Sequence, residues 1–185
     1  MSQVNFSSTS SVSFGELGPT TSLQLMFAKL QLELAETAKS QAMDKMDAIA
    51  TAQDEQKLVS QLLNEARQAK ADANSGVGSD KEKTQTYELP KKDADGNVVR
   101  DAQGKVVYET VTETVPKGNK ATFMSQEMVD YMDAHGLAYD KTGNNHSHSA
   151  DEWDVAITAL ESRLEELGTN TQQEMVYVQD YMGQY

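Results

Sequence analysis

The chain has 185 residues, no cysteine, a hydrophobic fraction of 38% and a formal net charge of −13. The charge excludes nucleic acid and anionic membrane as favoured partners, because both carry the same sign. The lack of cysteine excludes disulfides, zinc–thiolate sites and a cysteine nucleophile. No run of about 18 apolar residues occurs, so no membrane-spanning segment is expected.

Residues 1–19 are rich in serine and are predicted to form a disordered tail. They contain neither a basic start nor a long apolar run, so they do not match a Sec-type signal peptide. The tail ends at Pro19, and the hydroxyl groups of Thr20, Thr21 and Ser22 offer caps for a helix that starts there.

Residues 20–75 are predicted to form one long coiled-coil helix. Good helix formers dominate this segment, and no glycine or proline interrupts it before Gly76. Its apolar residues recur at steps of three and four, which is the pattern of a coiled-coil seam. A helix of this length needs a partner helix along much of it. The predicted seam consists of Leu23, Phe27, Leu30, Leu34, Ala38, Ala42, Met46 and Ile49, and it resumes with Val59, Leu63 and Ala66.

The first turns of this helix are apolar on two faces. At 100° per residue, Leu25 and Leu32 project nearly opposite to Leu23, Leu30 and Leu34. One partner helix covers one face, so the second face needs another cover. A second copy of the chain, a chaperone and the returning tail are all candidates, and a buried helix end in a monomer is the alternative.

Residues 76–148 are predicted to form an insertion of different character. Alternating β-branched residues, separated by turn residues, predict β-hairpins over residues 86–116. A short amphipathic helix follows over residues 125–135, with Ser125 as its cap and Gly136 at its end.

Inside the insertion, residues 93–99 recur almost unchanged eight residues later, each time with an acidic residue shortly before a glycine. A calcium loop of the EF-hand type requires oxygen ligands at fixed positions. Aligning either Gly96 or Gly104 with the loop glycine places lysine, valine or alanine at ligand positions. Tight hairpin turns fit better, because glycine supplies the positive φ that they require. A divalent-metal protein that uses residues 93–104 is kept as an alternative, testable by calorimetry with calcium.

His146 and His148 form an H-x-H pair in a predicted polar loop, with Asp140 and Asp151 nearby. Two loop histidines without a third fixed ligand do not define a metal site. The sequence also lacks a glycine-rich phosphate loop and the signature motifs of serine hydrolases and zinc proteases. We therefore predict no catalytic, cofactor-binding or metal-binding residues, no cofactor and no enzyme activity.

Residues 149–185 are predicted to form the second coiled-coil helix. Ser149 and Glu152 form a capping box, and the seam then alternates steps of four and three. Eight acidic residues and one basic residue predict a solvated acidic face. Because the seam reaches Tyr185 without a stop signal, we expect the native helix to continue beyond it. The predicted seam consists of Trp153, Ile157, Leu160, Leu164, Leu167, Thr171, Glu174, Val178, Tyr181 and Tyr185.

These elements predict a mainly α fold: a long antiparallel coiled-coil helical hairpin with a small α/β insertion that contains β-hairpins. Two stretches match a known pattern, LQLMFAKLQLELAETAKSQAMDKM in the first helix and SQEMVDYMDAHGLAYD around the short helix. The second contains Glu127, Val129, Tyr131 and Met132. With the order of the elements, they resemble the EspA-like filament proteins of bacterial type III secretion systems. The likeness covers about residues 20–75 and 124–185 and leaves the hairpins of the insertion unmatched.

The resemblance implies a secreted structural subunit that self-assembles into a filament or tip complex, a conduit for translocators and effectors. Residues 1–19 would then be an export-signal-like tail. Implied partners are further copies of the chain, a cognate cytoplasmic chaperone before export, and the needle subunit and translocator pore proteins at the bacterial surface. A needle-tip cap of fixed stoichiometry and a cytosolic coiled-coil chaperone or adaptor are the alternatives. The residues assigned to assembly or partner contact are Leu25, Phe27, Leu32, Leu34, Trp153, Ile157, Leu160, Leu164 and Val178.

Overall fold

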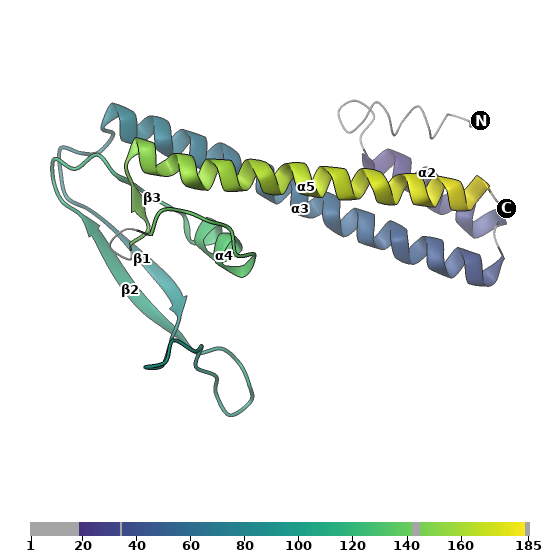
Figure 1. Cartoon of the computed structure of the whole chain (residues 1–185), viewed down its shortest axis with the longest axis horizontal. Coiled ribbons are helices and arrows are strands. Elements are labelled where there is room, and N and C mark those ends of the chain that lie inside the picture. The colour runs from purple at the N-terminus through teal and green to yellow at the C-terminus, as the bar shows by residue number, and fades with distance from the viewer. Residues whose placement is uncertain (1–18, 34, 142–144, 184–185) are drawn as a thin grey trace. The chain divides into compact units, whose positions relative to one another are not determined.

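A computed structural model describes residues 19–33, 35–141 and 145–183 (Figure 1). The described chain is mainly helical, with two small antiparallel strand pairs. Of the predicted tail, only Pro19 is among the described residues. Leu34 and Tyr185 of the predicted seams also lie outside the described residues. The elements are α2 (Pro19–Glu33), α3 (Glu36–Ser75), β1 (Lys83–Pro90), β2 (Tyr108–Val115), β3 (Thr122–Phe123), α4 (Gln126–Ala134), β4 (Ser147–His148) and α5 (Ala150–Gly183).

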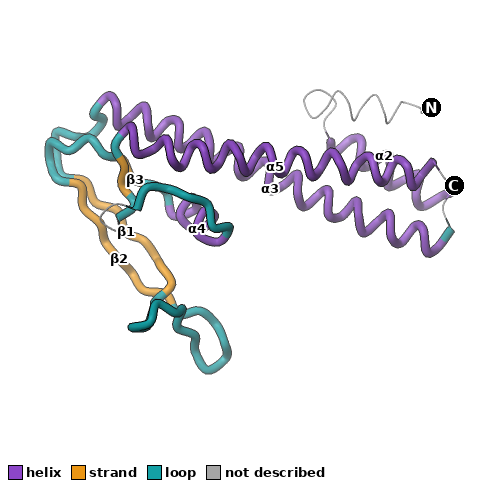
Figure 2. The backbone as a smooth tube through the Cα atoms, in the orientation of Figure 1, coloured by secondary structure: helices purple, strands orange, loops and turns teal. Residues whose placement is uncertain are grey.

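The chain divides into two compact units, Met1–Gln61 with Glu161–Tyr185, and Leu62–Leu160. We call the described part of the first the three-helix unit, and the second the insertion unit. All the strands, drawn in orange in Figure 2, belong to the insertion unit together with α4. The long helices α3 and α5 contribute residues to both units.

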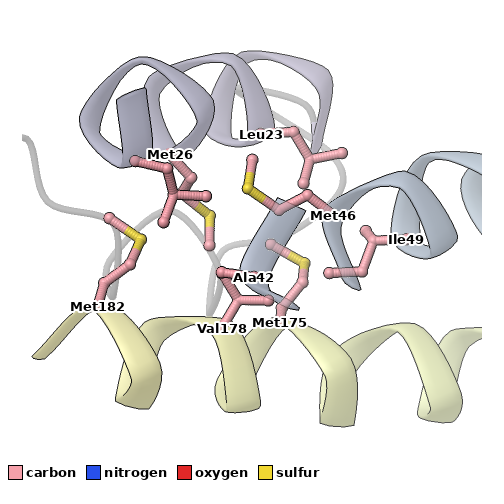
Figure 3. Packing of buried hydrophobic residues seen from close by; sticks show 9 residues of the cluster. Leu23, Met26, Ala42, Met46, Ile49, Met175, Val178 and Met182 are labelled. Carbon is pink, nitrogen blue, oxygen red and sulfur yellow. The ribbon is translucent and has the colours of Figure 1, made fainter. Parts of the chain in front are cut away.

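In the three-helix unit, α2, α3 and α5 each bury an apolar stripe (Figure 3). On α2, the residues Leu23, Met26 and Leu30 recur at steps of three and four, so one face of the helix is apolar. Four of the nine cluster residues are methionines, whose flexible side chains fill irregular gaps between helices. The cluster consists of Leu23, Met26, Leu30, Ala42, Met46, Ile49, Met175, Val178 and Met182.

The prediction of one uninterrupted helix over residues 20–75 is wrong at one point, because α2 ends at Glu33 and α3 begins at Glu36. No glycine or proline lies there, so local helix propensity does not cause the break. The break lets α2 pack its apolar face against α3 and α5. Burying a side chain such as Leu23 or Met26 is worth about 1.5–3 kcal/mol, which favours the reversal over a straight helix.

In the three-helix unit, α3 and α5 pack together and run in opposite directions. Lys45 Nζ lies 3.0 Å from Glu174 Oε2, and Arg163 Nη2 lies 2.6 Å from Glu55 Oε2. The pair that lies later in α3 therefore lies earlier in α5, as expected of antiparallel helices. These ion pairs are partly exposed and contribute little stability, so apolar burial holds the helices together.

Up to Thr171 the predicted seam of α5 agrees with the buried positions except at Ile157 and Leu164, which are only half-buried, and Ala156 is buried in place of Ile157. Beyond Thr171 two of its positions drift by one residue. The buried positions beyond Thr171 are Met175, Val178 and Met182, so Met175 and Met182 replace the predicted Glu174 and Tyr181. An 11-residue step from Leu167 to Val178 explains the drift, because it corresponds to about 3.67 residues per turn rather than 3.5. A strict heptad repeat is therefore wrong in this part of α5.

In the insertion unit, β1 and β2 form an antiparallel ladder from Lys83↔Val115 to Pro90↔Tyr108, which confirms the predicted hairpin. The predicted short helix is confirmed as α4, where Ser125 Oγ accepts a hydrogen bond from the Met128 N–H at 3.2 Å. The unit has its own core, in which aromatic and methionine side chains dominate. Its largest fully buried side chains are Tyr87, Met124, Met128, Met132, Trp153, Leu62 and Leu160.

Residues 91–107 join β1 to β2 as two successive hairpins of the same design. In the first, Asp93 Oδ1 accepts hydrogen bonds from the backbone N–H groups of Asp95 and Asn97, both at 2.9 Å. In the second, Asp101 Oδ1 accepts hydrogen bonds from the backbone N–H groups of Gln103 and Lys105, also both at 2.9 Å. Gly96 and Gly104 have φ of 83° and 82°. The predicted tight turns are confirmed, and one oxygen of each aspartate serves its own turn.

The two hairpins and the β1–β2 ladder meet in a cycle of three backbone hydrogen bonds. Lys91 donates to the Val107 carbonyl at 2.8 Å, Val107 donates to Val99 at 2.9 Å, and Val99 donates to Lys91 at 2.9 Å. The three residues are spaced eight apart, which is also the spacing of the repeated segments 93–99 and 101–107. The sequence repeat therefore corresponds to the geometry of this three-way junction. We call residues 90–108 the junction.

Candidate functional site

The first candidate surface is the outer side of α2. Leu25 is 43% exposed, whereas Leu23 and Leu30 on the opposite side are buried. Phe27 is partly buried against the cluster of the three-helix unit. At Leu25 this arrangement agrees with the two-faced pattern that the sequence predicts. The side chain of Leu32 lies outside the described residues, as Leu34 does.

The α5 residues assigned to assembly pack inside the chain. Trp153, Leu160 and Val178 each have 0% exposure. Ile157 and Leu164 are half-buried. These five side chains stabilise the fold of one copy, and any part that they have in contacts between copies stays a prediction.

The exposed apolar residues of α5 lie outside its predicted seam. Val176 is 48% exposed and Tyr177 is 45% exposed. The Tyr177 ring lies 5.6 Å from the ring of Tyr181, and Lys45 Nζ lies 5.0 Å from the Tyr177 centroid. The assembly residues predicted on this helix all lie along its seam, which contains neither Val176 nor Tyr177.

A second candidate site is a buried cluster of histidine and aromatic rings in the insertion unit. The His146 ring lies 4.8 Å from the Tyr87 ring and 6.0 Å from the Tyr139 ring. Glu113 holds this histidine, because Oε2 lies 2.7 Å from His146 Nδ1 and Oε1 accepts the His146 backbone N–H at 2.7 Å. Burial raises the pKa of both tyrosines above their ordinary value, so both are neutral phenols.

His148 lies deeper in the same unit, with 1% of its surface exposed. Its ring and the ring of Trp153 pack in a T-shaped arrangement with centroids 5.1 Å apart, and its Nε2 atom has no hydrogen-bond partner among the described residues. Burial lowers the pKa of His148, although the charges of Glu152 and Asp140 oppose that shift. Burial therefore favours the neutral form of the imidazole.

His146 lies in a loop as predicted, but the prediction of polar surroundings is wrong for both histidines. His146 is 8% exposed, and His148 lies in β4, opposite Thr122 of β3. Both side chains belong to the core, because partners distant in sequence cover them. Within residues 19–33, 35–141 and 145–183, no group of three or more metal-ligating side chains could hold a metal ion.

Trp153 anchors the start of α5 in the insertion unit. Its Nε1–H donates to Thr122 Oγ1 at 2.8 Å, and the Thr122 hydroxyl donates to the Ala69 carbonyl at 2.8 Å. A tryptophan that is fully buried and hydrogen-bonded in this way is a core residue.

The third candidate surface is the junction. Val98 is 38% exposed and Tyr108 is 58% exposed, and both lie next to the three-bond cycle. Exposed aromatic residues on a rigid backbone are favoured at protein–protein contacts. The sequence pattern of this segment predicts turns and does not single out contact residues.

Comparisons of the chain with protein families, with curated proteins and with solved structures find no match. None of the helices in the described part of the chain is long and apolar enough to cross a lipid bilayer. The functional proposal therefore rests on the exposed residues of α2, of α5 and of the junction.

Proposed function

We propose that the chain is a structural subunit of a type III secretion filament or tip complex, which self-assembles through its helices into a conduit for translocators and effectors. In this proposal it is secreted to the needle tip, after a cytoplasmic stage with a cognate chaperone. Its partners are further copies, the needle subunit and the translocator pore proteins. The support is the resemblance of its two helical stretches to the EspA-like family, together with the packing described above.

The finer architecture in this proposal is an antiparallel coiled-coil hairpin of α3 and α5. The opposed pairs Lys45–Glu174 and Glu55–Arg163 support it, as do the buried stripes of both helices. The 11-residue step in α5 departs from the strict heptad of a left-handed coiled coil.

The observation that carries self-assembly is the exposure of Leu25 opposite the buried face of α2. The short helix is covered within the chain on the side of Leu23, Met26 and Leu30, and it presents a leucine, 43% exposed, on the other side. An exposed leucine of this kind is available for a contact between copies. The acidic surface opposes unspecific association, so such a contact needs defined complementarity.

The test is light scattering of purified full-length protein at rising concentration. A filament subunit shows a mass that grows with concentration, whereas a tip cap of fixed stoichiometry reaches one mass and stays there. A chain that stays monomeric at every concentration contradicts both forms of the proposal. Export that depends on the secretion apparatus separates the proposal from a cytosolic chaperone or adaptor, which is retained in the cell.

A further inference from the structure

The junction presents six residues on one face. Successive side chains of an extended chain point to opposite sides, and directly paired residues share a side. The residues that flank the three-bond cycle therefore lie opposite to Lys91, Val99 and Val107. They form three cross-strand pairs, Pro90 with Tyr108, Lys92 with Val98, and Arg100 with Val106. We call these six residues the junction face.

The junction face is apolar and cationic. Tyr108 and Val98 are exposed, and Lys92 and Arg100 are exposed beside them. Arg100 Nη1 donates to the Gly104 carbonyl at 2.9 Å, which holds the guanidinium over its own hairpin. No carboxylate belongs to the six residues.

The charge of this region differs from that of the rest of the chain. Residues 81–120 contain eight basic and seven acidic residues, whereas the remainder contains eight basic and twenty-two acidic residues. An acidic surface therefore meets less repulsion in the region of the junction than in the remainder of the chain taken together.

The backbone holds the junction face in place without a core beneath it. The cycle through Lys91, Val99 and Val107 and the two aspartate-capped turns satisfy the backbone groups at the crossing point. Val99 and Val107 are only half-buried. A surface that is ordered before binding loses less conformational entropy when a partner docks.

The outer side of α5 has the complementary chemistry. Glu165 and Glu166 are exposed and line a shallow hollow together with Ser162, Thr169 and Asn170. The one basic residue of α5, Arg163, is half-buried and bonded to Glu55 and Glu166. The outer side of the helix is therefore acidic.

We propose that the junction face of one copy docks on the acidic outer side of α5 in a second copy. This inference rests on the proposed self-assembly and names a contact that builds it. Lys92 and Arg100 would face Glu165 and Glu166, and Tyr108 and Val98 would supply the apolar part of the contact. The two surfaces are different patches of the same chain, so the contact is head-to-tail and can repeat along an open filament.

Charge reversal on each surface tests the contact. One full-length variant carries K92E and R100E, and the other carries E165K and E166K. Each alone is expected to raise the concentration at which assembly begins by about tenfold or more, because like charges then meet across the contact. Mixed in equal amounts, the two variants are expected to assemble again, because each supplies the opposite charge that the other lacks.

The control variant K117E/K120E makes the same change of charge in the insertion unit outside the junction face, and it is expected to assemble like the wild type. Circular dichroism of each variant establishes that the helices are retained. Unchanged assembly of both single-surface variants, or no recovery on mixing, overturns the docking contact and leaves the proposed function standing. A wild type that stays monomeric overturns both.

Discussion

The carboxylate of Glu113 contacts His146 twice. One oxygen, Oε1, accepts a hydrogen bond from the His146 backbone N–H, and the other, Oε2, lies 2.7 Å from His146 Nδ1. The pair ties β2 to the segment that leads into α5. Both side chains are only 11% exposed, so water screens the contact poorly.

Replacing Glu113 with alanine is expected to destabilise the insertion unit by about 1–3 kcal/mol, because it leaves two polar groups of His146 buried without a partner. Glu109 provides the matched control, since it is an exposed glutamate on the same strand. Urea unfolding followed by tryptophan fluorescence measures both variants, because Trp153 lies in the affected core. Equal midpoints for E113A and E109A would mean that the pair contributes nothing to stability.

Acid is expected to destabilise the insertion unit through His148. Its folded pKa lies below the ordinary value of 6.5, chiefly because of burial, so the unfolded chain binds the proton more readily. Stability is therefore highest above about pH 6.5 and falls as the pH drops from that value towards the folded pKa. Glu152, Asp140, Glu113 and His146 also act on the ring.

Urea midpoints at a series of pH values from neutral to mildly acidic measure this dependence. The variant His148→Phe keeps a ring against Trp153 and removes the titrating group, so its midpoint is expected to vary less over the same series. A variant that shows the same acid sensitivity as the wild type would assign the effect to other groups.

The junction is expected to depend on its positive-φ glycines. At Gly104 an added Cβ would meet nothing within 4 Å, so a substitution there causes only backbone strain. Gly104→Ala is expected to destabilise the hairpin by about 1 kcal/mol, and Gly104→Asn by less, because asparagine tolerates a positive φ better. Amide hydrogen exchange at Val99 and Val107 reports the effect. Similar protection in the alanine, asparagine and wild-type proteins would contradict the importance of the turn geometry.

The packing of α2 in the three-helix unit is expected to depend on the buried side chains of its inner face. Met26 is fully buried in the cluster, so Met26→Ala leaves a cavity and is expected to cost about 2–5 kcal/mol. Leu25→Ala changes an exposed neighbour and is expected to stay within about 0.5 kcal/mol. Thermal unfolding followed by circular dichroism compares the two. If both variants unfold alike, α2 does not pack as described.

The helical periodicity of this sequence predicts most of the buried stripe, because spacing along a helix is a local property. Leu23, Ala42, Ile49, Leu160 and Val178 all occupy the sides expected of them. The cap at Ser125 and the turns at Gly96 and Gly104 are equally local, and they were predicted for the same reason.

Features that depend on distant partners were missed. The break after Glu33 has no signal in the neighbouring residues, because it results from packing against α3 and α5. His146 is polar in a segment rich in turn residues, and only its contact with Glu113, 33 positions away, places it in the core. The sequence shows the repeat that contains Val99 and Val107, but it does not predict the backbone hydrogen bonds that join them to Lys91 in a cycle.

Negative-stain electron microscopy of the wild type and of Leu25→Asp, at rising and matched concentrations, tests self-assembly through the outer side of α2 most directly. The control is Val77→Asp, the same kind of change at an apolar residue 54% exposed outside the helices. We expect filaments from the wild type and the control, and a folded monomer from L25D. Filaments of L25D at the wild-type concentration would contradict the role of α2, and no assembly of the wild type at any concentration would contradict the proposed function itself.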